Sequence, residues 1–253
     1  MSKPQVVFKN LDKRYGSGPL VLDDINLEVQ AGEFVSLIGP SGCGKSTFLK
    51  LISGLTASTS GELVVDGMTP ENARSEMAYI FQEANLLPWL RVQKNVELAL
   101  EVSGHVDKHR RKEIADRMIE LVGLADARDQ FPRQLSGGMR MRVSIARALS
   151  LSPRILLLDE PFGALDEMTR DRLNEEILAI RAKENWTAFF VTHSVNEAVF
   201  LSSRIVVLSA NPGRVSEIIE VPFPYPRTAE LRESDAFLAL TKRTSMALRS
   251  VMV

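Results

Sequence analysis

The sequence predicts an α/β fold whose core is a mixed, mainly parallel sheet, together with an antiparallel β layer and a helical insertion. Apolar runs at 155–158 and 188–192 flank a helical stretch, and strands that alternate with helices are typical of a parallel sheet. Residues 6–29 instead alternate β-rich runs with turns, which favours antiparallel pairing. Between 85 and 149 the strand-like runs give way to helical spacing.

The predicted elements of the core follow in chain order. Before the insertion we expect antiparallel strands, a buried strand, a helix and one more strand, over 6–10, 20–29, 34–38, 45–53 and 61–65. After it we expect a strand, a helix and three strands, over 155–158, 170–183, 188–192, 204–209 and 214–221.

The insertion and the C-terminal part complete the predicted organisation. In the insertion, Ile114, Met118, Leu121 and Val122 recur at helical spacing and would line one face of a helix. Near the C-terminus, a proline-rich connector leads into an amphipathic helix over roughly 229–252. We therefore expect a core (1–84 and 150–221), a helical subdomain (85–149), and a C-terminal connector with its helix (222–253).

The composition is that of an ordinary globular protein. Of 253 residues, 45% are hydrophobic and 25% are charged, and the net charge of −1 gives no electrostatic case for binding nucleic acid. A single cysteine excludes an internal disulfide and fits a reducing compartment. The N-terminus is polar, and no apolar run approaches the roughly 20 residues that would span a bilayer.

A glycine-rich segment connects the strand predicted at 34–38 to the helix predicted at 45–53. Its residues fit the pattern G-x-x-x-x-G-K-[ST], and they are Gly39, Pro40, Ser41, Gly42, Cys43, Gly44, Lys45 and Ser46. The backbone N–H groups of such a loop converge on phosphate, and the helix N-terminus adds partial positive charge. Lys45 would supply a full charge, and the Ser46 hydroxyl could ligate Mg²⁺. These two residues argue against a turn that only connects two elements, and they predict a P-loop NTPase core.

Cys43 lies inside this loop and permits two interpretations. A thiol beside a helix N-terminus and a lysine can have a lowered pKa, which would make it redox-sensitive. Alternatively, Cys43 is a small residue that fills the loop, and this is the interpretation we favour.

Two carboxylates end the apolar strand predicted at 155–158. The C-terminal end of a central parallel strand lies beside the phosphate loop in open α/β sheets. Asp159 is suited to hold Mg²⁺ through water, and Glu160, which points elsewhere, could act on the attacking water as general base. An apolar strand that ends at a polar turn is by itself weak evidence for a catalytic site. In a chain that also carries the phosphate loop, the same pattern is strong evidence.

The segment Leu135-Ser-Gly-Gly-Met-Arg resembles the signature motif of ABC-transporter nucleotide-binding subunits. Its flanks agree, because Arg142-Val-Ser-Ile-Ala-Arg-Ala-Leu and then Asp159-Glu-Pro-Phe-Gly-Ala-Leu-Asp follow it. The resemblance extends from about residue 7 to 221 and implies the ABC ATPase fold, with ATP and Mg²⁺ as cofactors.

The resemblance also implies roles for individual residues. Tyr15 would stack on adenine, residues 39–47 through Thr47 would hold the phosphates, and Gln82 would sense Mg²⁺ and the attacking water. His193 would contact the γ-phosphate. Ser136, Gly137 and Gly138 would cap the γ-phosphate bound to a partner subunit, and Asp166 would organise the dimer interface. Met139 stands where the commonest signature has glutamine, and a thioether cannot replace the two donors of that amide.

Narrower phrases resemble one branch of the family. Asn85-Leu-Leu-Pro-Trp-Leu, residues 161–170 and Asn211-Pro-Gly-Arg-Val are similar to bacterial importers for nitrate, sulfonates, taurine or bicarbonate. Importers of riboflavin or pyrimidine precursors have similar subunits, so the solute stays open. The residues around Leu87–Arg91 would receive a membrane subunit if Trp89 is exposed, whereas Trp89 could instead pack into the helical subdomain.

The implied partners are a second ATPase subunit in a homodimer, integral membrane permease subunits and, indirectly, a periplasmic or extracellular solute-binding protein. The implied location is the cytoplasmic face of the inner membrane, as a peripheral subunit. An ABC ATPase of translation or DNA repair is an alternative, but such proteins generally carry two cassettes or a long coiled-coil insertion. An ATP-binding regulator without hydrolysis is another, and Glu160 and His193 argue against it.

Overall fold

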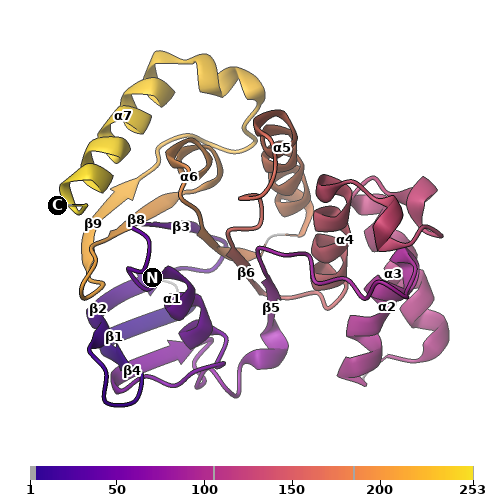
Figure 1. The fold of residues 1–253 in the computed structure, drawn as a ribbon, viewed down its shortest axis with the longest axis horizontal. Helices are drawn as coiled ribbons and strands as arrows, with labels where there is room; N and C mark the ends of the chain where they lie inside the picture. The colour runs from indigo at the N-terminus through magenta and orange to yellow at the C-terminus, as the bar shows by residue number, and fades with distance from the viewer. Residues whose placement is uncertain (1–3, 105, 185, 253) are drawn as a thin grey trace.

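The computed structural model describes residues 4–104, 106–184 and 186–252. The first three residues of the polar N-terminus lie outside the described residues, as do residues 105, 185 and 253. Its central sheet has the order β5-β6-β7-β3-β8-β9 (Figure 1). All neighbouring strands pair in parallel except β8 and β9, which are antiparallel. The strands are β3 (Phe34–Ile38), β5 (Met77–Ile80), β6 (Ile155–Asp159), β7 (Thr187–Val191), β8 (Arg204–Leu208) and β9 (Val215–Glu220).

A separate antiparallel layer has the order β2-β1-β4, as the alternating runs at the N-terminus predict. Its strands are β1 (Val6–Arg14), β2 (Leu20–Val29) and β4 (Ser60–Val65). This layer and helix α1 (Lys45–Ile52) pack on one face of the central sheet, where they bury Val35 and Leu37 of β3 and Leu157 of β6. The phosphate-loop segment therefore lies between the two β layers.

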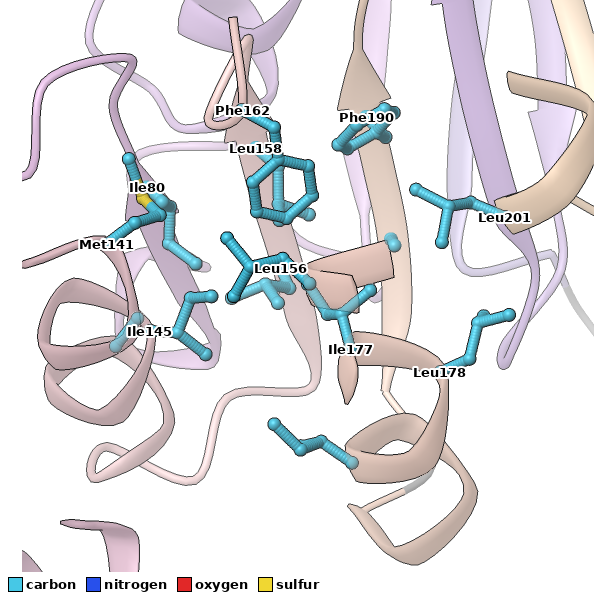
Figure 2. Packing of buried hydrophobic residues seen from close by; sticks show 14 of the residues in the cluster. Ile80, Met141, Ile145, Leu156, Leu158, Phe162, Ile177, Leu178, Phe190 and Leu201 are labelled. Carbon is cyan, nitrogen blue, oxygen red and sulfur yellow. The ribbon is translucent and has the colours of Figure 1, made fainter. Parts of the chain in front are cut away.

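The other face of the sheet is covered by helices. Residues alternate along each strand, so Ile38 of β3 and Leu156 and Leu158 of β6 point to this face. Figure 2 shows Met141 and Ile145 of α4 on one side of Leu156 and Ile177 of α5 on the other. These helices are α4 (Gly137–Leu149), α5 (Glu167–Glu184), α6 (Val195–Leu201) and α7 (Asp235–Ser250). Each fully buried leucine contributes about 2 kcal/mol of transfer free energy.

The helical insertion consists of α2 (Val92–Ser103), α3 (Lys108–Leu121) and α4, with short 3₁₀ turns at Ala125–Ala127 and Pro132–Gln134. On α3 the predicted apolar face is the packed one, since Met118 and Val122 are buried and Ile114 and Leu121 pack against the same core. In Figure 1 this group of helices projects to one side of the sheet, away from α1. No helix among the described residues is long and apolar enough to cross a bilayer.

The structure differs from the sequence prediction in several elements. Strand β1 extends to Arg14 and not only to residue 10, and helix α6 was not predicted. The C-terminal helix predicted over 229–252 is split into a 3₁₀ turn, η4 (Ala229–Glu233), and α7, because Ser234 starts a new helix by accepting a hydrogen bond from the Phe237 N–H. Strand β5, preceded by a 3₁₀ turn at Arg74–Glu76, was not predicted. Its apolar run is only four residues long and gives little periodicity.

Candidate active site

The phosphate-loop segment forms a hollow at the C-terminal end of β3. Gly44 caps α1 with a left-handed φ of 99°, a conformation that favours glycine. The hollow has a volume of about 320 Å³. Its lining residues come from the core alone, and they are Val21, Ser41, Gly42, Gly44, Lys45, Ser46, Thr47 and Glu160. The Lys45 ammonium donates to the carbonyls of Gly39 (2.9 Å) and Pro40 (3.0 Å), so its charge is held inside the loop.

Asp159 lies beside this hollow and accepts hydrogen bonds on both carboxylate oxygens. The Ser46 hydroxyl donates to Oδ1 at 2.9 Å, and the Tyr79 hydroxyl donates to Oδ2 at 2.9 Å. Among the described residues, no cluster of three or more His, Cys, Asp or Glu side chains could hold a metal by itself. A hydroxyl and one carboxylate nevertheless suit Mg²⁺, which usually keeps several waters and takes its remaining ligands from substrate phosphates.

Glu160 and His193 meet at the mouth of the hollow. The Glu160 Oε2 and His193 Nδ1 atoms are 3.5 Å apart. Glu160 has a φ of 48°, which is rare for a residue with a side chain, and its N–H donates to the Val191 carbonyl at 3.0 Å. This left-handed turn aims Glu160 away from its neighbour Asp159, and strained backbone of this kind is concentrated at functional sites.

Two other predicted residues lie near this centre. A Cβ atom built on Gly163 would lie 3.6 Å from both the Gln82 Nε2 and the His193 Cε1 atoms, so the two side chains flank this glycine. Tyr15 is 48% exposed, and its hydroxyl lies 3.4 Å from the Thr47 hydroxyl at the edge of the loop. The Tyr15 ring is therefore available for a flat ligand, with the Lys13 ammonium 4.6 Å from its centre on one side.

The signature residues do not line the hollow of their own chain. Ser136 is the exposed N-cap of α4 and accepts a hydrogen bond from the Met139 N–H at 3.2 Å. Gly137 and Gly138 form the first turn of that helix, and the Met139 side chain packs against the apolar core.

Asp166 likewise caps a helix on the exposed surface. It accepts a hydrogen bond from the Thr169 N–H at 2.9 Å at the start of α5, and this bond holds the pKa of Asp166 below its usual value. Asp166 is also absent from the lining of the hollow.

Cys43 is buried, contrary to the hypothesis of an activated thiol. Burial raises the pKa of Cys43, and this effect outweighs the opposing influence of the Lys45 charge. The structure thus agrees with the interpretation of Cys43 as a small residue that fills the loop.

Sequence reasoning missed polar contacts at two places in the site. One is the bond from Tyr79 to Asp159, for which the available signal was a tyrosine inside a short apolar run, since buried tyrosine hydroxyls usually find a partner. The other lies beside His193, where the Thr192 hydroxyl donates to the carboxylate of Glu197 and accepts from the Ser194 N–H. Glu197 is 5% exposed, and burial raises its pKa.

Comparison with known proteins identifies the family. A family model described as ABC transporter matches residues 22–163. The aliphatic sulfonates import ATP-binding protein of Bacillus cereus (strain ZK / E33L) is 44% identical over 237 residues, which cover 94% of this chain and 91% of that protein. The nitrate import ATP-binding protein of Synechococcus elongatus is 44% identical over 216 residues, covering 84% and 79%. Relatives of similar identity have names that specify no solute.

Solved structures agree with this assignment. A dimeric ATP-binding cassette in a post-hydrolysis state, bound to ADP and Pi, superposes with a TM-score of 0.76 at 34% identity and covers 87% of this chain and 100% of its own. Together with the mixed sheet described above, this match confirms the predicted fold class. The chain belongs to the ABC transporter family as an ATP-binding subunit and is an ATPase.

Proposed function

We propose that this subunit hydrolyses Mg²⁺-bound ATP in a head-to-tail homodimer and thereby energises import of a small solute. The observation that carries the proposal is the Glu160–His193 pair, with 3.5 Å between Oε2 and Nδ1, at the mouth of a hollow that already contains Lys45 and Ser46. A base, an imidazole and a phosphate cradle in one place are the parts that phosphoryl transfer to water requires.

Residues of the core bind the triphosphate. The backbone N–H groups of the loop 39–44 and the N-terminus of α1 attract the phosphates, and Lys45 exchanges its loop carbonyls for the β- and γ-phosphates. Tyr15 stacks on adenine. Ser46 would ligate Mg²⁺, Asp159 would hold the ion through water, and Gln82 would also contact it. When bound, the ion neutralises negative charge that develops on the phosphate oxygens.

Glu160 and His193 act on the γ-phosphate and the attacking water. Glu160 accepts a proton from the water as general base, and Gln82 orients that water. His193 donates a hydrogen bond to the γ-phosphate from the end of β7, near Glu160. Catalysis then rests on positioning and on stabilisation of charge, which supply most of the rate in phosphoryl transfer.

A second copy of the chain completes each site. The hollow is open and lined only by core residues, so Ser136, Gly137 and Gly138 of the helical subdomain (85–149) can serve the ATP of a partner. Exposed Asp166 lies at the dimer interface. In this division, the core (1–84 and 150–221) binds ATP, and the C-terminal segment (222–253) supports the core.

The membrane permease subunits dock on the helical subdomain. Trp89 is 69% exposed, which supports docking over the alternative of internal packing. Farther along α2, a groove of about 750 Å³ separates the subdomain from the core, and Met77, Leu100, Val106 and Ile114 are among its lining residues. An amphipathic helix of a membrane subunit fits such a groove, and docking there holds the ATPase pair as a peripheral assembly at the cytoplasmic face of the inner membrane.

The solute is a small anion such as nitrate, a sulfonate including taurine, or bicarbonate. This part of the proposal is supported by the names of the sulfonate and nitrate relatives, each 44% identical. A solute-binding protein outside the membrane would select the anion. Uptake of labelled sulfonate and nitrate by cells with and without the gene would test it.

The catalytic assignment is tested by Glu160→Gln. The substitution keeps the shape of the side chain but removes its basicity, so kcat should fall by about 10²–10⁴ because general acid–base catalysis typically contributes that factor. ATP binding should persist within about twofold, and ATP with Mg²⁺ should trap a dimer in size-exclusion chromatography. Steady-state phosphate release gives kcat.

Glu62→Gln is the matched control, since it removes an exposed carboxylate of the β layer that pairs only with Lys9 among the described residues. Turnover by Glu160→Gln at the rate of this control would contradict the role given to Glu160.

A further inference from the structure

Tyr79 lies on the same face of the sheet as Asp159. In the parallel pair β5–β6, Tyr79 is opposite Leu157, and Asp159 follows two residues later on β6. The Tyr79 hydroxyl can therefore reach along the strand to Oδ2 of Asp159, at 2.9 Å. Ser46 occupies the other oxygen, Oδ1, at the same distance. The carboxylate is thus held from both sides.

The Tyr79 ring is fixed, and so is the direction of its hydroxyl. Its ring stacks on Phe81 with 4.4 Å between centroids and 26° between planes, and it packs against the apolar cluster beneath α1. A tyrosine hydroxyl is protonated at neutral pH and a carboxylate oxygen only accepts, so Tyr79 is the donor in this bond.

We propose that Tyr79 is a positioning residue that orients Asp159 for Mg²⁺. By holding Oδ2, its hydroxyl turns Oδ1 toward Ser46 and the water shell of the ion. Hydrogen bonds to a metal-binding carboxylate from outside the first coordination shell commonly change metal affinity by 10–100-fold. The effect expected here is about tenfold, the lower end of that range, because Asp159 acts through water. This inference rests on the proposed magnesium site.

Tyr79→Phe tests the inference, because it removes the hydroxyl and keeps the ring that stacks on Phe81. The measurement is the dissociation constant of β,γ-imido-ATP, which is not hydrolysed, determined by calorimetry in excess Mg²⁺ and in EDTA. In EDTA, Tyr79→Phe should bind like the wild type. The gain in affinity on adding Mg²⁺ should be about tenfold smaller in the variant.

Tyr225→Phe is the matched control. It removes a tyrosine hydroxyl that donates to the Leu201 carbonyl at 2.7 Å in another part of the molecule, and it should keep the full Mg²⁺-dependent gain. A general loss of stability would weaken binding with and without Mg²⁺ alike, and that result would overturn the positioning role.

Two further outcomes separate this inference from the function on which it rests. If Tyr79→Phe keeps the full Mg²⁺-dependent gain of the wild type, the role of Tyr79 is wrong and the magnesium site stands. If the wild type itself gains no affinity from Mg²⁺, the proposed magnesium site fails and the inference fails with it.

Discussion

Gly213 is pressed against the outer side of the phosphate loop. Its N–H donates to the Val21 carbonyl at 2.9 Å, and its carbonyl accepts from the Asp23 N–H at 2.9 Å. A Cβ atom built on Gly213 would lie 2.1 Å from the Cys43 carbonyl oxygen and 3.0 Å from that of Val21. Gly213 belongs to the segment that begins at Asn211, which in the sequence was only a resemblance to one branch of the family. In the structure this segment packs against the phosphate loop and supports the nucleotide site.

Gly213→Ala should therefore weaken ATP binding. The nearest atom to the new methyl group is backbone, so the phosphate loop must shift, and overpacking of this kind costs about 1–3 kcal/mol. We expect roughly a tenfold rise in the ATP dissociation constant, which corresponds to about 1.4 kcal/mol, and a lower thermal midpoint. Calorimetry and thermal denaturation measure these quantities. An unchanged dissociation constant would show that the loop tolerates the displacement.

At the scale of single residues, the sequence predicted the contacts that lie within motifs and missed those that depend on register. Lys45 and Ser46 could be identified because their motif fixes their place after a strand. The bond between Tyr79 and Asp159 joins residues 80 positions apart and requires the pairing of β5 with β6, which no local pattern encodes. For Cys43 the sequence left a lowered pKa open as the less favoured interpretation, because desolvation, which opposes the lysine charge, depends on how the antiparallel layer packs on the loop.

Helix α6, which follows His193, is held at both ends. At its start, Ser194 caps the helix by accepting from the Glu197 N–H. At its end, the Arg227 guanidinium donates to the carbonyls of Phe200 at 2.7 Å and Ser202 at 2.9 Å. These are among the carbonyls that a helix C-terminus leaves unpaired. The C-terminal connector thus fixes α6, the helix that directly follows His193, and so helps to hold His193 in place.

Arg227→Gln should destabilise the fold. Arg227 is 6% exposed, and a hydrogen bond from a charged donor contributes about 1.5–3 kcal/mol, so we expect a loss of about 3 kcal/mol in the free energy of unfolding. Burial lowers the pKa of Arg227, but an arginine remains protonated throughout the pH range of the measurement. Urea denaturation followed by circular dichroism gives the free energy.

The matched control is Arg249→Gln, which removes an exposed arginine from the last turn of α7 and should change the free energy of unfolding by less than about 0.5 kcal/mol. Equal stability of the two variants would contradict the role given to Arg227.

Among the elements, periodicity predicted the long helices and the strongly apolar strands. Helix α3 of the insertion and strands β3, β6 and β7 lie close to where the pattern indicates, whereas no bounds could be predicted for α2 and α4. The split of the last helix at Ser234 was missed, because apolar spacing continues across the break while the cap depends on backbone geometry. The position of β5 at the edge of the sheet is a matter of topology, which spacing along the chain does not reveal.

On the scale of the whole molecule, the phosphate hollow and Ser136 of the signature belong to different parts of one chain. The phosphate hollow lies between the two β layers, whereas Ser136 begins α4 in the group of helices that Figure 1 shows beside β5 and β6, on the side away from α1. An open hollow lined by core residues alone is consistent with closure by a second copy, and a solved relative with ADP and Pi is dimeric.

Ser136→Arg should abolish hydrolysis and spare ATP binding by the monomer. The side chain is exposed and does not line the hollow of its own chain, so the ATP dissociation constant should change by less than about twofold. A bulky cation would obstruct closure over the partner's ATP, and therefore turnover should fall to background. For the same reason, Mg²⁺–ATP should no longer trap a dimer when Ser136→Arg is combined with Glu160→Gln.

Ser234→Arg is the matched control, because Ser234 caps α7 with the same 3.2 Å bond from a backbone N–H. Loss of either cap costs about 1 kcal/mol. The control should hydrolyse ATP and form the dimer normally. If Ser136→Arg does the same, the site is complete within one chain and the signature residues serve only to cap α4.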